Sequence, residues 1–152
     1  MISTHPHERF SAVVSLEPGA TSAFAHAVGD TNPVHHDAEY AAASRFGRLL
    51  ASGPQTTAHL LALTASHFSN RGAMLGLEFW VRFRRPVYAD ETITLEWLVV
   101  SVKKNSGLDG EIIDLRGRIR KENGETAVGA KGRVLVTRSL APVEKPPVEK
   151  GH

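Results

Sequence analysis

The chain has 152 residues, of which 41% are hydrophobic and 22% are charged, and its formal net charge is +2. This length suits one domain with a full hydrophobic core, and the composition excludes disordered and fibrous classes of protein. The absence of cysteine excludes disulfides, thiolate nucleophiles and cysteine-ligated metal sites. Because the basic residues are mixed with acidic ones, nucleic acid is not an expected partner.

No apolar run approaches the roughly 20 residues that a membrane-spanning helix needs, and the start MISTHPHERF lacks the apolar core of a secretory signal. We therefore expect no membrane contact and a cytoplasmic location. Residues 1–138 are expected to form a single domain. Residues 139–152 (SLAPVEKPPVEKGH) cannot bury a core face, which predicts a disordered tail.

The first part of the chain predicts one strand and two helices. Residues 9–16 are typical of a short strand, and residues 21–28 predict a helix. Residues 38–45 predict a second helix, with Asp37 as its N-cap. Residues 30–36 are then a loop held between two helices.

The stretch 54–68 is the most apolar helical segment, with Ser52 as its N-cap. Apolar side chains recur in it at three- and four-residue spacing, which predicts a buried helix. The expected buried stripe consists of Ala58, Leu61, Ala62, Ala65 and Phe68, and Leu60 and Leu63 widen it.

Four strand-length runs follow and complete an α+β pattern, one antiparallel sheet with one apolar helix packed against it. The turn between the last two runs contains Asn123-Gly124, a strong hairpin signal. The four runs are residues 74–85, 92–103, 111–121 and 125–137.

The loop DTNPVHH places a carboxylate (Asp30), an amide (Asn32) and an imidazole (His35) close together, and Pro33 restricts its conformation. A carboxylate held beside an imidazole suits paired proton transfer near neutral pH. The same spacing also allows a purely structural turn, because Asn-Pro commonly starts one.

A second candidate is Gly53, which begins the apolar helix and can present its amide hydrogen in the positive field of the helix terminus. Such a donor can form an oxyanion hole, although Ser52 followed by Gly53-Pro54 is equally a plain helix start.

No metal site is expected, since the adjacent His35 and His36 usually point apart. An arginine group could meet phosphates of a small ligand, but on a strand it more often forms a solvated face: Arg82, Arg84 and Arg85.

The run GDTNPVHHDAEYAAASRFGRLLASGPQTTAHL resembles the hydratase signature of the MaoC-like, (R)-specific enoyl-CoA hydratase family. The later run FRRPVYADETITLEW resembles that family's strand–turn–strand segment. The resemblance implies a hot-dog fold, in which an antiparallel β-sheet wraps around a central apolar α-helix. It also implies a lyase that adds water to, or removes it from, an enoyl thioester by syn addition, without a metal or cofactor.

The family's functional residues match positions in this chain. The resemblance implies catalytic roles for Asp30, His35 and Asn32, and an oxyanion role for Gly53. Substrate contacts are implied for Ser52, which stands where the family often has His, and for Thr56, and the phosphates of the carrier are expected near basic residues. These candidates are Arg45, Arg48 and Lys103.

The implied substrate is an acyl-CoA or acyl-carrier thioester, and the implied assembly is a homodimer. Two other functions stay open on the sequence. The first is a thioesterase, although hot-dog thioesterases generally take a carboxylate from the central helix and residues 54–68 have none. The second is a non-catalytic acyl-CoA-binding subunit of a heteromer, against which the presence of both Asp30 and His35 argues.

Overall fold

The computed structural model describes residues 3–141, and in this part of the chain one antiparallel sheet packs against helices. The predicted tail of residues 139–152 lies outside the described residues from 142 onward. The division of the chain at residue 138 therefore stays a prediction. The helices are α1 (Pro18–Ala27), the 3-10 helix η1 (Pro33–His35), α2 (Ala38–Ala43) and α3 (Gly53–Phe68).

Local capping explains where the two short α-helices begin and end. Helix α1 begins at Pro18, earlier than predicted, because proline suits a first turn whose amide hydrogens have no intrahelical acceptor. Asp37 caps α2 as predicted, and its Oδ1 accepts from the Tyr40 amide at 3.0 Å. Helix α2 ends before the predicted residue 45, because Ser44 is extended and its hydroxyl donates to the Ala41 carbonyl.

The sheet has the strand order β1-β3-β4-β5-β2, and every neighbouring pair is antiparallel. Strands β1 and β2 are therefore its two edges. The predicted turn at Asn123-Gly124 is confirmed, and Gly124 takes the left-handed φ of 85° that the turn requires. The strands are β1 (Arg9–Ser15), β2 (Ala73–Phe83), β3 (Thr92–Asn105), β4 (Gly110–Arg120) and β5 (Thr126–Thr137).

Strand β2 ends at Phe83, before the predicted residue 85. The amides of Arg84 and Arg85 both donate to the carbonyl of Ala127, at 2.8 and 3.1 Å. Two consecutive amides cannot share one ladder partner in a regular strand, so the pairing stops here.

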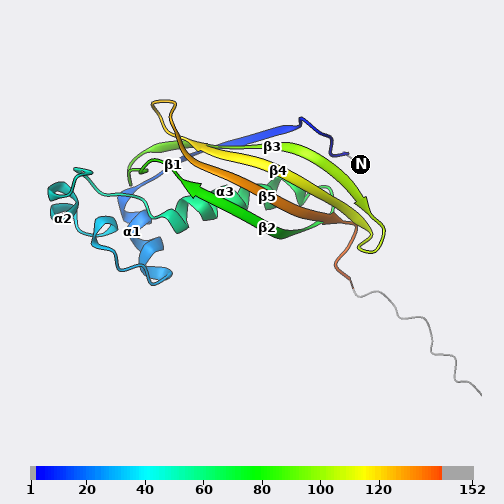
Figure 1. Ribbon diagram of the computed structural model, residues 1–152. Coiled ribbons are helices and arrows are strands. Elements are labelled where there is room, and N and C mark those ends of the chain that lie inside the picture. The colour runs from blue at the N-terminus through cyan, green and yellow to red at the C-terminus, as the bar shows by residue number, and fades with distance from the viewer. Residues whose placement is uncertain (1–2, 142–152) are drawn as a thin grey trace, which may run out of the picture.

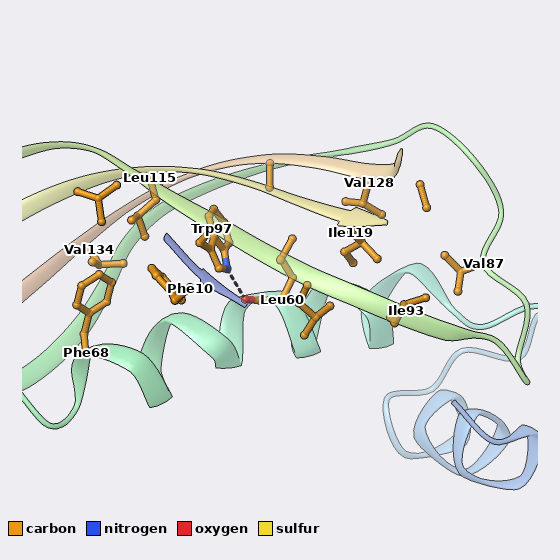
Figure 2. Packing of buried hydrophobic residues seen from close by; sticks show 14 of the residues in the cluster. Phe10, Leu60, Phe68, Val87, Ile93, Trp97, Leu115, Ile119, Val128 and Val134 are labelled. Carbon is orange, nitrogen blue, oxygen red and sulfur yellow. Dashed lines mark hydrogen bonds between the residues drawn. The ribbon is translucent and has the colours of Figure 1, made fainter. Parts of the chain in front are cut away.

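Helix α3 lies along one face of the curved sheet, while α1 and α2 lie together at one end of it (Figure 1). Alternate residues of β3 face the helix and are buried, among them Ile93 and Trp97. The indole Nε1–H of Trp97 donates to the carbonyl of Leu60 on α3 at 2.8 Å, as Figure 2 shows. This bond fixes the helix against the middle of the sheet.

The buried stripe of α3 differs from the predicted one. Ala58, Ala62 and Ala65 are exposed in the single chain, so the prediction was wrong for them, whereas Leu60 and Phe68 are fully buried as expected. Thr64 can be buried because its hydroxyl donates to the carbonyl of Leu61 at 2.6 Å. The buried residues recur mostly at four-residue spacing: Gln55, Thr56, Leu60, Thr64 and Phe68.

Within the described residues, no helix is both long and apolar enough to cross a membrane. Residues 3–141 also contain no group of three His, Asp or Glu side chains placed to hold a metal ion.

Candidate active site

Asp30 is held at its backbone by the helix that precedes it. Gly29 takes a left-handed φ of 79°, which turns the chain out of α1, and the amide of Asp30 donates to the carbonyl of Ala25 at 2.8 Å. The Oδ1 atom of Asp30 accepts from the amide of Asn32 at 3.0 Å. Its other oxygen, Oδ2, remains available to a neighbour.

The short helix η1 presents the imidazole of His35. Asn32 caps this helix, with its Oδ1 accepting from the Val34 amide at 3.3 Å. Asn32 thus holds the backbone of the loop, and its predicted catalytic role stays a prediction. His35 is buried, with 7% of its surface exposed.

The tautomer of His35 follows from the contact that its Nδ1 atom makes with a backbone carbonyl. Its Nδ1 lies 2.8 Å from the carbonyl oxygen of Leu50, and because a carbonyl oxygen only accepts, Nδ1 must carry the hydrogen. In the neutral ring the lone pair is then on Nε2. That atom lies 3.4 Å from Oδ2 of Asp30. Two proton acceptors thus face one another across a gap slightly longer than a hydrogen bond.

The N-terminus of α3 provides a donor that lines the same cavity as His35. Gly53 is the first residue of the helix, so its amide hydrogen has no intrahelical acceptor. Ser52 is fully buried and its side chain caps the helix by accepting from the Gln55 amide at 3.2 Å. The Thr56 hydroxyl donates to the Gly53 carbonyl at 3.2 Å. Both hydroxyls therefore make hydrogen bonds within the first turn of α3.

A cavity of about 450 Å³ lies at His35 and the start of α3. Asn32, His35, Gly53 and Thr56 line it, whereas Asp30 does not line it and lies behind His35, with its Oδ2 3.4 Å from Nε2 of that ring. The remaining walls come mainly from apolar side chains and from two arginines at the end of β2: Val34, Phe46, Leu50, Ala51, Phe83, Arg84, Arg85, Pro86, Val87 and Val128.

Cavity size alone does not identify this site. Three other hollows have comparable volumes, about 460, 470 and 520 Å³, and none is lined by Asp30, Asn32, His35 or Gly53. The one of about 470 Å³ shares Phe83, Arg84 and Arg85 with the cavity at His35. The cavity at His35 is distinguished by its chemistry, because it combines an imidazole, a helix N-terminus and apolar walls.

Four predicted substrate contacts do not line this cavity, and one of them, Lys103, lies on β3 opposite Ile112 of β4. Ser52 lies beneath the helix start, Arg45 lies over the ring of Phe46, and Arg48 stacks on Tyr88 with 3.8 Å between guanidinium carbon and ring centroid. Their roles stay predictions. The sequence contained one signal for the basic residues that do line the cavity, the run of three arginines at residues 82–85.

Comparison with known proteins adds a family and a fold to this geometry. Residues 3–114 match the MaoC like domain. A UPF0336 protein of Streptomyces griseus is 34% identical over 120 residues, covering 74% of this chain and 77% of that one. The solved R-hydratase PhaJ1 of Pseudomonas aeruginosa has a TM-score of 0.78 at 24% identity and covers 97% of this chain and 94% of its own. The (R)-hydratase of A. caviae involved in PHA biosynthesis has a TM-score of 0.80 at 24% identity, covering 88% and 98%. The predicted hot-dog fold is confirmed.

Proposed function

Because the chain belongs to the MaoC-like domain family, as the sequence predicted, we propose that it adds water to the 2,3 double bond of an enoyl thioester or removes it from the 3-hydroxyacyl form. The observation that carries this proposal is that Nε2 of His35 lies 3.4 Å from Oδ2 of Asp30. The hydrogen on Nδ1 of His35 is bonded to the carbonyl of Leu50, which leaves Nε2 as a proton acceptor. A single water to one side of this gap, within hydrogen-bond distance of both acceptors, can donate one hydrogen to each.

In the hydration direction, the water oxygen bonds to C3 of the enoyl group while Nε2 of His35 takes a proton from it. The negative charge of Asp30 stabilises the imidazolium that forms. The proton then passes to C2, so one molecule of water is added across the double bond. Because a single pair of groups serves both carbons, both bonds form on the same face and the addition is syn.

Negative charge gathers on the thioester oxygen as the C3 bond forms. The donor that we propose for it is the amide hydrogen of Gly53, which has no intrahelical acceptor and is helped by the dipole of α3. A preorganised donor of this kind contributes about 3 to 4 kcal/mol to lowering a barrier. Asn32 supports the reaction by holding the loop, through its bond from the Val34 amide.

The walls of the cavity favour an acyl chain attached to a phosphate-bearing carrier. Val34, Leu50 and Val87 supply apolar surface near His35, whereas Arg84 and Arg85 are exposed at the cavity's margin. Guanidinium groups bind phosphates well. We therefore propose an acyl-CoA or an acyl-carrier thioester as the substrate, with its phosphates at these two arginines.

A homodimer is the proposed assembly. Strand β2 is an edge of the sheet, and it exposes several large apolar side chains in the single chain. The exposed alanines of α3 add to the apolar surface that a second copy would cover. The exposed apolar residues of β2 are Leu75, Leu77, Trp80 and Phe83.

The predicted cytoplasmic location stays a prediction.

Hydrolysis of the thioester and passive binding are the two alternatives. Helix α3 contains no Asp or Glu, so it offers no carboxylate for hydrolysis. A passive subunit has no chemical need for both Asp30 and His35. The test is to incubate the protein with crotonyl-CoA and to measure both the loss of enoyl absorbance and the release of free thiol. Loss of absorbance without thiol, yielding the (R)-3-hydroxy product, is expected; thiol release would establish a thioesterase instead.

A further inference from the structure

A second histidine, His36, follows the proposed base directly and does not line the cavity at His35. Its Nε2 lies 2.8 Å from the carbonyl oxygen of Asp30, and its Nδ1 lies 2.7 Å from the hydroxyl of Ser22 on α1. A carbonyl oxygen only accepts, so Nε2 donates to it, and the neutral ring accepts from the Ser22 hydroxyl through Nδ1. The imidazole therefore bridges α1 and the backbone of the catalytic carboxylate.

Helix α1 is built to receive this ring. Ser22 and His26 are four residues apart, so they lie on the same face of the helix. The ring of His26 lies tilted against that of His36, with 3.9 Å between centroids and 35° between planes. His36 is thus fixed by a hydrogen bond at one edge and by an aromatic ring on its face.

The backbone of Asp30 is consequently held from both sides. Its amide donates to the Ala25 carbonyl at 2.8 Å, and its carbonyl accepts from His36 at 2.8 Å. With both peptide groups fixed, the carboxylate has little freedom except at its own side-chain torsions. One of its oxygens is bound by the Asn32 amide, which leaves the other beside His35.

We propose that His36 is a positioning residue for the reaction, which holds the carboxylate of Asp30 at its working distance from His35 through the bond to the Asp30 carbonyl. This inference rests on the proposed function. It assigns His36 no contact with substrate. A misplacement of reacting groups by about 1 Å can cost about a hundredfold in rate, so a residue of this kind acts on kcat.

Two conservative variants separate this role from a merely structural one. The amide nitrogen of Gln reaches the place of an imidazole Nε2, whereas that of Asn reaches the place of Nδ1. His36→Gln keeps the donor to the Asp30 carbonyl and loses the contact with Ser22. His36→Asn does the reverse. If His36 only tied the loop to α1, the Asn variant would be at least as active as the Gln variant.

The experiment measures kcat and KM of the three proteins with crotonyl-CoA, with urea unfolding as a check on their folding. We expect His36→Gln to keep most of the wild-type kcat and His36→Asn to lose about tenfold or more, with KM nearly unchanged in both. Equal activity of the two variants, or a loss confined to KM, would overturn the inference.

A readout without turnover keeps this test separate from the proposed function. The NMR signals of the Asp30 carboxyl group and of the His35 ring in substrate-free protein report how these two groups lie relative to one another. We expect these signals to differ between His36→Asn and His36→Gln, with the Gln variant nearer to wild type. A wild type that hydrates no enoyl thioester would sink the proposed function, and these spectra would then decide the role of His36 alone. Identical signals in the two variants would refute it.

Discussion

The phenyl ring of Phe83 lies against Gly53, so close that a Cβ on that glycine would meet two ring carbons at 3.0 Å. The contact joins the edge strand β2 to the first residue of α3. It places an aromatic wall beside the amide that we propose as the oxyanion donor. The absence of a side chain at Gly53 is therefore a condition for the shape of the cavity.

Gly53→Ala should lower kcat for enoyl-thioester hydration by about tenfold or more, because the displaced Phe83 ring changes the cavity at the reacting carbonyl. The double variant Gly53→Ala/Phe83→Leu should recover part of the loss, since Leu leaves room for the new methyl group. Steady-state kinetics of the two variants provide the check. A single variant as fast as wild type would show that this contact has no bearing on the reaction.

The proposed binding of the carrier's phosphates by Arg84 and Arg85 can be tested. Replacing both Arg84 and Arg85 by Ala should raise KM for crotonyl-CoA by about threefold to tenfold, the range expected for exposed charge pairs. KM for a crotonyl thioester without phosphate should not change. Arg116→Ala, an exposed arginine of the sheet outside this cavity, serves as the control. An equal rise for both substrates would argue that the arginines do not bind phosphate.

Gly117 tests the packing of the sheet on α3. It pairs with Trp97 across β3 and β4, and a Cβ at Gly117 would overlap the indole ring. Gly117→Ala should reduce the free energy of unfolding by about 1 to 3 kcal/mol, the usual cost of overpacking. Urea unfolding measures this. Gly19→Ala, where a Cβ would meet nothing within 4 Å, should show no such loss.

The surroundings of Glu8 lead us to expect that the free energy of unfolding falls in acid. Burial raises the pKa of Glu8, but hydrogen bonds from Arg71 and His67, together with their charges, outweigh burial and leave this pKa below its ordinary value. The folded protein thus prefers the ionised carboxyl. Its contribution is present above the ordinary glutamate pKa of about 4.3 and is lost as the pH falls through the lowered pKa.

Glu8→Gln should accordingly be less stable than wild type at pH 7, by about 1 to 3 kcal/mol, because Arg71 is left without its carboxylate. The difference should shrink in acid. Urea unfolding of both proteins at neutral and acidic pH gives the comparison. A difference that is the same at both pH values would contradict the assignment.

Features that depend on neighbouring residues could be predicted from the sequence. The caps at Asp37 and Ser52 and the turn at Asn123-Gly124 are of this kind, because each is decided within a few residues. The chemistry of Asp30 and His35 could be inferred from their spacing only as one possibility among several, and the family resemblance made it specific.

Features set by distant contacts could not be predicted. The end of β2 depends on the Ala127 carbonyl, far along the chain, which accepts from two amides. Arg84 and Arg85, which follow this strand end, line the cavity. The buried face of α3 was misjudged for a related reason, since the sheet decides which side of the helix it covers, and Thr64 can be buried by satisfying its own hydroxyl.

The most direct test of the account compares Asp30→Asn with Asp37→Asn in the hydration of crotonyl-CoA. Asp37 is a matched control, because it lies on the same stretch of chain and only caps α2, a task that Asn performs equally well. We predict that Asp30→Asn loses about a hundredfold or more of the rate that enoyl absorbance reports, while Asp37→Asn stays near wild type. An Asp30→Asn protein that hydrates crotonyl-CoA as fast as the control would contradict the assignment of this site.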